Sequence, residues 1–365
     1  MRPIRMILLL ALACLPLAAG AEAVVEDLHG FTVVDAHRHL ETDEGAQAWI
    51  EKQHAATAAH FRKLPDAKAM ASRLEALSRL GGATWPTAAG ERTFFLKREG
   101  DEEQSILYVR EGDGTTRALV DPAKLDAGGK VALDWYYPSP SGKLVAYGLS
   151  ENGTENSVLH VLDVATGEQV HERIPNTRHA SIAWLPDESG FYYTRYPEGE
   201  RYDRHVYLHR FGDDPAKDAY VQGRQNDKTD WTMVRITPDG RRLFIEVSKG
   251  WSVTELWMLD REEGELRVVI PASLGALFES PTWIDDRIVV RTNHGAPNWK
   301  VVAIDPDDAE PDEWETLIPE GRWPMEAMER VGDRLAIARL EKAVSRLELY
   351  RLDGTPAGEA ELPGM

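Results

Sequence analysis

The sequence has almost no cysteine, a deficit of basic residues and no long apolar run beyond its first residues. Its 365 residues include one cysteine, Cys14, which excludes an internal disulfide and a cysteine-rich metal site. Lysine and arginine total 42 against 61 aspartate and glutamate, so the formal charge is 42 − 61 = −19. Such a chain repels phosphate backbones and anionic lipid, and we therefore expect neither nucleic acid nor a membrane surface as a partner.

Residues 1–23 have the pattern of a secretory signal peptide. Arg2 and Arg5 supply the positive start, residues 6–17 form a short apolar core, and small residues follow as cleavage sites. The apolar run is shorter than the roughly 20 residues that a membrane span needs. Cys14 lies inside it, but Ala11 stands where a lipoprotein signal would have a large aliphatic residue. We expect a secreted, periplasmic protein without membrane contact after signal cleavage.

Residues 24–82 are predicted to form an N-terminal helical segment. Between residues 44 and 80, the run 46–59 contains no helix breaker, and Met70, Leu74, Leu77 and Leu80 recur at three- and four-residue spacing. Gly81 and Gly82 end this pattern. Amphipathic helices of this kind need a partner surface for their apolar stripes.

The strongest signal is a long repeat that begins near Thr84 and predicts a β-propeller over residues 83–365. A turn residue precedes an apolar β-run six times, at intervals of 52, 48, 50, 46 and 47 residues. These turn residues are Gly90, Gly142, Gly190, Gly240, Asp286 and Asp333. A second β-run follows each one, as in residues 107–109 and 159–161.

Two such runs with flanking strands make a four-stranded unit of the size of a propeller blade. A β-sandwich would show turns every 8–12 residues without this long register. We therefore predict a mainly β fold, a propeller with about six countable four-stranded blades. The sixth ends near Leu362 and no closing strand follows, so either six blades close by apolar packing alone or a further blade is missing. We favour the second alternative and expect the propeller to be incomplete.

Several stretches together resemble the N-terminal part of prolyl oligopeptidases, and the resemblance covers essentially the whole mature chain. They are residues 34–41, 48–53, 104–110, 133–135, 138–143, 182–184, 190–193, 292–294 and 297–298. The resemblance implies a seven-bladed propeller over an α/β-hydrolase domain, with the helical segment packed on the hydrolase. It further implies a serine peptidase that cleaves short proline-containing peptides, the propeller gating their access.

The chemistry of such a peptidase is missing from these residues. A hydrolase serine needs small flanking residues in a tight elbow, as in G-x-S-x-G, and no such pattern occurs. The nearest string, around Ser150, has the wrong spacing and leads into another β-run. We assign no catalytic residue, no metal and no cofactor. The resemblance implies that a hydrolase domain is supplied as a partner, either by a separate chain or by a further segment of this one.

His179 and Trp251 are the candidate substrate contacts. His179 precedes the run 180–184, where the resemblance implies a propeller aromatic that reaches toward the substrate, and an imidazole can also stack on a peptide. A loop histidine without a role is the alternative. Trp251 follows Lys249 and Gly250, in a second loop that the family places near the substrate. The alternative, which we favour, is a tryptophan packed between blades.

Two alternative hypotheses about the function of the chain remain. Asp35, His37 and His39 match the D-x-H-x-H metal motif of amidohydrolase barrels, but that reading needs a β/α barrel and further ligands. We favour surface histidines. The second rival is a non-enzymatic periplasmic propeller that binds a peptide or protein partner.

Overall fold

The computed structural model describes residues 23–362, in two compact units divided between Leu80 and Gly81. All but the last residue of the predicted signal peptide, residues 1–23, therefore lie outside the described residues. Within the described range, no helix combines the length and the apolar character needed to cross a membrane.

Unit 1 contains the expected helices, but it begins with a β-hairpin that the sequence reading did not foresee. The hairpin pairs β1 (Val24–Leu28) with β2 (Phe31–Asp35), and η1 (Arg38–Glu41), α1 (Asp43–Phe61) and α2 (Ala67–Ser78) follow. Arg38 holds the hairpin to η1, because its guanidinium reaches Glu26 at 2.6 Å and Asp35 at 3.0 Å. The apolar side chains of α2 are exposed, as expected for a stripe that needs a partner surface.

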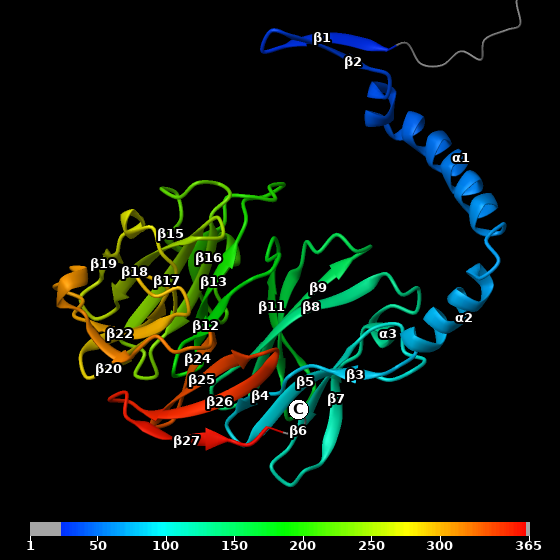
Figure 1. Ribbon diagram of the computed structural model, residues 1–365. Helices are drawn as coiled ribbons and strands as arrows, with labels where there is room; N and C mark the ends of the chain where they lie inside the picture. Colours follow the sequence, from blue (N-terminus) through cyan, green and yellow to red (C-terminus); the bar gives the residue numbers. More distant parts are fainter. Residues whose placement is uncertain (1–22, 363–365) are drawn as a thin grey trace, which may run out of the picture. The chain divides into compact units, whose positions relative to one another are not determined.

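Unit 2 is built from six antiparallel sheets, each made of consecutive strands (Figure 1). The first sheet contains β3 (Gly82–Ala83), β4 (Thr87–Ala89), β5 (Arg92–Arg98), β6 (Ile106–Arg110) and β7 (Thr116–Val120). The second contains β8 (Val131–Pro138), β9 (Leu144–Glu151), β10 (Val158–Asp163) and β11 (Gln169–Ile174). The third contains β12 (Ile182–Trp184), β13 (Gly190–Arg195), β14 (His205–Arg210) and β15 (Ala219–Gln222).

The remaining three sheets repeat the same order. The fourth contains β16 (Trp231–Ile236), β17 (Arg242–Lys249), β18 (Val253–Asp260) and β19 (Glu265–Ile270). The fifth contains β20 (Phe278–Ile284), β21 (Arg287–Thr292), β22 (Lys300–Ile304) and β23 (Glu315–Ile318). The sixth contains β24 (Met325–Val331), β25 (Arg334–Glu341), β26 (Val344–Arg351) and β27 (Pro356–Ala360). One short helix, α3 (Pro122–Leu125), lies between the first two sheets.

The structure confirms the predicted mainly β propeller with six blades, of which five have four strands and the first has five. Every repeated turn residue begins the second strand of its sheet or lies one or two positions before it, and every following β-run is the third strand. In the first sheet, the role of the first strand is divided, because β3 and β4 pair with different parts of β5.

At the first two repeated turns, the backbone conformation and the close neighbours favour glycine. Gly90 and Gly142 have φ values of 57° and 70°, in the left-handed region that favours glycine. They also face each other across the first two sheets. A Cβ on Gly90 would lie 2.2 Å from the Ser141 carbonyl oxygen, and one on Gly142 would lie 2.4 Å from that of Ala89. The repeated turn residues at Gly90 and Gly142 therefore lie where neighbouring blades come close together.

The sheets pack against one another in sequence order through five apolar clusters. Each cluster joins two successive sheets, from the first and second to the fifth and sixth. The middle strands are buried from both sides, as in β17, where Leu243, Phe244 and Ile245 are fully buried. On the sixth sheet, Leu347 and Leu349 point away from its cluster with the fifth sheet and are only partly buried.

The order of strands determines where each loop lies. Since the strands of a sheet alternate in direction, the loop after the second strand and the connection to the next sheet lie at the same end. We call this the crossover end; it includes residues 121–130, 152–157, 175–181, 196–204, 223–230 and 250–252. Both His179 and Trp251 lie there.

A buried ionic network joins the second sheet to the third. His209 is fully buried, and its two ring nitrogens lie 2.8 Å from Asp218 and 2.8 Å from Glu172. Tyr193 donates to Asp218 at 2.7 Å and the Gly212 amide donates to Glu172 at 3.0 Å. Burial by itself lowers the pKa of His209, but the hydrogen bonds and charges of Asp218 and Glu172 outweigh it and raise the pKa above 6.5.

We predict that His209→Gln destabilises the propeller by about 3–5 kcal/mol at acidic to neutral pH, because it leaves two buried carboxylates without a cation. The pKa of His209 is raised in the folded state. Its contribution to the free energy of unfolding is therefore complete below the unfolded-state pKa and is lost as pH rises through the folded-state value. Urea unfolding of both proteins across a pH series measures this. The difference in unfolding free energy should shrink toward alkaline pH. A His54→Gln control, in exposed α1, should leave stability unchanged, and a pH-independent His209 difference contradicts the prediction.

Candidate functional site

The two sequence-predicted contacts lie at the crossover end, on neighbouring sheets. His179 is in the connection from β11 to β12, and its side chain is 45% exposed. Its Nε2 lies 3.5 Å from a Glu155 carboxylate oxygen, and its ring lies 5.8 Å from that of Trp231, centroid to centroid. His179 is therefore held at the surface by one acid and one aromatic neighbour.

Trp231, which the sequence analysis did not single out, forms the centre of this site. It is the first residue of the innermost strand β16 and is 42% exposed. The guanidinium carbon of Arg204 lies 3.6 Å from the centroid of its ring. Trp231 thus has His179 at one side, a guanidinium stacked against it and open solvent over part of its surface. We call Trp231, His179 and Arg204 the platform.

Arg204 makes the platform rigid. It is 3% exposed, donates to the Tyr196 hydroxyl at 2.8 Å and 3.1 Å, and donates to the Thr232 carbonyl at 3.1 Å. Burial lowers its pKa, while the neighbouring Tyr196 opposes that change. A buried arginine that is fully hydrogen-bonded and stacked does not reorient freely, so it fixes the plane of Trp231.

Trp251 is not packed between blades, and that interpretation was wrong. It lies at the tip of the β17–β18 turn and is 98% exposed, because a turn that projects from the sheet has no neighbouring blade to cover it. The base of this turn is anchored beside the platform. Lys249 reaches the buried carboxylate of Asp230 at 2.8 Å, and Asp230 directly precedes Trp231.

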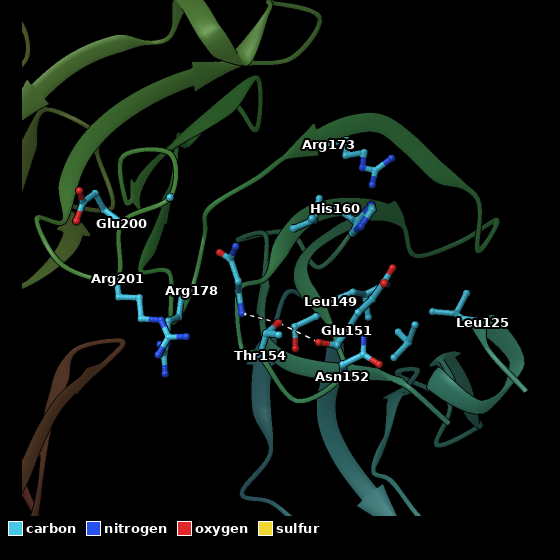
Figure 2. A pocket seen from close by; sticks show the side chains of 15 residues that line it. Leu125, Leu149, Glu151, Asn152, Thr154, His160, Arg173, Arg178, Glu200 and Arg201 are labelled. Carbon is cyan, nitrogen blue, oxygen red and sulfur yellow. Dashed lines mark hydrogen bonds between the residues drawn. The ribbon is translucent and has the colours of Figure 1, made fainter. Parts of the chain in front are cut away.

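A cavity of about 590 Å³ lies at the crossover end of the second and third sheets (Figure 2). Arg178, the neighbour of His179, contributes to its wall together with Arg173 of β11 and Arg201 of the β13–β14 loop. Arg178 forms an ion pair with Glu155. Burial, and then the charge of Arg173, lower the pKa of His160, which also faces the cavity.

The innermost strands line the middle of the propeller, where two cavities lie. One, of about 440 Å³, is lined by parts of the first four sheets, and the other, of about 380 Å³, by parts of the last three. Arg235 of β16 reaches Glu329 of β24 at 3.1 Å, so this ion pair links the fourth sheet to the sixth. Burial raises the pKa of Glu246, which faces the first cavity, to about 7, against the opposing charge of Arg235.

The D-x-H-x-H segment does not form part of a barrel. Asp35 ends β2, where it accepts the His37 amide at 2.8 Å and pairs with Arg38. Among residues 23–362, no group of three or more His, Cys, Asp or Glu side chains is arranged to hold a metal. Ser150 lies within β9 rather than in an elbow, and its hydroxyl donates to Asp134 at 3.0 Å.

Sequence reasoning predicted two residues that lie on the surface at this end, His179 and Trp251, but it did not single out Trp231 or Arg204. Trp231 is 52 residues after His179, close to the repeat interval, and both precede or begin the innermost strand of a sheet. Their equivalent positions in the repeat could have been used to predict Trp231 as a site residue. No local sequence pattern predicts the burial of Arg204.

Comparisons with known proteins agree with this architecture. The family described as "Prolyl oligopeptidase, N-terminal beta-propeller domain" matches residues 16–365. A prolyl endopeptidase of Elizabethkingia miricola is 27% identical over 349 residues, which cover 92% of this chain and 49% of that protein. A prolyl oligopeptidase A of Galerina marginata is 27% identical, with coverage of 79% and 44%.

Solved structures show the same fold. One from a structural and mechanistic analysis of two prolyl endopeptidases superposes with a TM-score of 0.85 at 30% identity, covering 96% of this chain and 53% of that one. Prolyl oligopeptidase B from Galerina marginata, bound to a 35mer hydrolysis and macrocyclization substrate, has a TM-score of 0.78 at 20% identity, with coverage of 93% and 53%. The chain spans about half the length of the curated relatives it matches. It belongs to the prolyl oligopeptidase family, whose N-terminal β-propeller region it contains.

Proposed function

We propose that this chain is the propeller-bearing N-terminal portion of an exported serine peptidase that hydrolyses short proline-containing peptides. The observation that carries the proposal is the family match over residues 16–365, together with relatives named as prolyl endopeptidases. The catalytic serine, its base and the oxyanion donors would be supplied by a hydrolase domain outside these 365 residues. Within this chain, the propeller would gate access and contribute substrate contacts.

The platform supports a role in holding the peptide. Proline and aromatic side chains are flat and apolar, and they stack well on the exposed face of an indole. Since Arg204 holds Trp231 in place before a ligand arrives, little conformational entropy is lost on binding. His179 flanks the indole, and Trp251 projects from the neighbouring turn of the same end.

The ion pair between Arg235 and Glu329 supports the gating role. Both side chains are exposed to solvent in the middle of the propeller, at 41% and 60%. Exposed ion pairs contribute about 0–1 kcal/mol, so such a link can open without unfolding any sheet. It would restrict passage along the middle of the propeller while leaving the blades intact.

The partly buried face of the sixth sheet supports a further blade. Leu347 and Leu349, with Ala336 and Ala338 opposite them, lie on the face that points away from the fifth sheet. Each of the other gaps between successive sheets is filled by apolar side chains. A seventh blade, as the family resemblance implies, would cover this face.

If the catalytic residues lie in a hydrolase domain outside these 365 residues, this chain alone should not hydrolyse a proline-containing peptide. It should also not react with a fluorophosphonate probe for catalytic serines. The DNA downstream of the Met365 codon should encode a serine elbow, in the same or an adjacent reading frame. Expression of that segment with this chain should restore both hydrolysis and labelling. Labelling of this chain alone contradicts the proposal. Peptide binding without any such segment instead favours a non-enzymatic peptide-binding propeller, which the completeness of all six sheets would allow.

For the platform, we predict that Trp231→Ala weakens the binding of a proline-containing peptide to the chain about tenfold, a loss typical of one aromatic contact. Trp231→Phe should retain most of the affinity because it keeps a flat apolar surface. Fluorescence polarisation of a labelled peptide measures both. Trp85→Ala removes a tryptophan that is 90% exposed and serves as the control. Equal losses in Trp85→Ala and Trp231→Ala would reject the platform.

For the gate, we predict that Arg235→Gln speeds the labelling of a cysteine placed at Thr282, which lines the cavity beside the ion pair. Because Cys14 is the only native cysteine, a Cys14→Ser background leaves one reactive thiol. If the ion pair stabilises the closed state by about 1 kcal/mol, its loss should increase the rate of the maleimide reaction about fivefold. Arg287→Gln, which breaks the exposed pair with Glu315 on the same sheet, is the control. Unchanged labelling in Arg235→Gln would show that the pair does not restrict access.

A further inference from the structure

The cavity beside the platform is lined by more basic than acidic side chains, although the chain as a whole is acidic. The chain has a formal charge of −19, but the cavity wall contains three arginines, Arg173, Arg178 and Arg201, against two glutamates, Glu151 and Glu200. Figure 2 shows the Glu200 carboxylate directed away from the arginines, while the side chains of Arg178 and Arg201 extend into the same part of the view. The volume of about 590 Å³ can hold several residues of a peptide.

Two of these arginines have no counter-ion of their own. Of the residues from 23 to 362, none forms an ion pair or a side-chain hydrogen bond with Arg173 or Arg201, whereas most other arginines of the propeller have such a partner. Arg178 pairs with Glu155, which holds it at the edge of the cavity. Guanidinium groups on a cavity wall that have no counter-ion favour an anionic ligand there.

Consecutive residues of the chain belong to the cavity wall and to the platform. Arg178 and His179 are consecutive, and the first faces the cavity while the second contacts Trp231. The Arg178 carbonyl also accepts a hydrogen bond from Arg204, the arginine stacked on Trp231, at 3.5 Å. A peptide lying on the platform can therefore extend directly into the cavity.

We propose that this cavity binds a carboxylate of the peptide whose apolar residue lies on the platform, so that the preferred substrates are acidic proline-containing peptides. The inference rests on the proposed function. The carboxylate can come from an Asp or Glu side chain or from a free C-terminus, since both offer the same bidentate geometry to a guanidinium. The long-range field of the chain makes the opposite prediction, because a charge of −19 repels an acidic peptide. The two effects are therefore separable by experiment.

The test uses three labelled peptides of one eight-residue sequence around a proline. One has glutamine and an amidated end, the second has glutamate in place of glutamine with an amidated end, and the third has glutamine and a free C-terminal carboxylate. Fluorescence polarisation with the chain measures their dissociation constants at low and at physiological ionic strength. We expect one or both carboxylate peptides to bind about tenfold more tightly than the neutral one, the gain of one charge-assisted contact. Salt should reduce this preference.

The Arg173→Gln/Arg201→Gln double variant should lower the preference to less than about twofold. Arg287→Gln, an arginine at the start of β21, is the matched control and should keep the preference. Equal binding of all three peptides, or a preference that survives the double variant, overturns the carboxylate site while leaving peptide binding intact. If no peptide binds, the proposed function itself fails and this inference fails with it.

Discussion

The packing of each sheet against the next is the constraint on which the rest of this structure depends. Five apolar clusters join the six sheets in sequence order, and the middle strands are buried from both sides. A stack of this kind leaves only its loop ends, its middle and its terminal faces for recognition. Because the strands alternate in direction, the crossover connections of neighbouring sheets all meet at one end. Residues about 50 positions apart in sequence, such as His179 and Trp231, therefore become neighbours.

Charge is used in two different ways inside this acidic chain. In the His209 network, one imidazole ring is enclosed by two carboxyl groups and joins the second and third sheets from within. At the crossover end, Arg204 is equally buried, but its charge is stacked on Trp231 and satisfied by a hydroxyl and a carbonyl group. The first arrangement stabilises a contact between blades. The second stabilises the orientation of a side chain that solvent, and a ligand, can reach.

The sequence was informative wherever backbone geometry restricts residue type. Left-handed turns and close blade contacts require glycine at Gly90 and Gly142, so the period of the fold was visible, and all six blades could be counted. The hairpin β1–β2 was missed because its ten residues lie beside a strong helical pattern and carry no repeat. Trp251 was misjudged because size favours burial on average, whereas the tip of a projecting turn has no surface to pack against.

The sequence by itself determined the blade count and the family, because the period of the turns and of the apolar runs is a local property of the chain. Only the tertiary structure decided which side chains share a site. Arg204 is separated from Trp231 by 27 positions and from Arg178 by 26, and no local pattern distinguishes it from a solvated arginine. Its burial follows from the closure of the third sheet against the fourth, and contacts formed by closure between sheets are not encoded in any one segment.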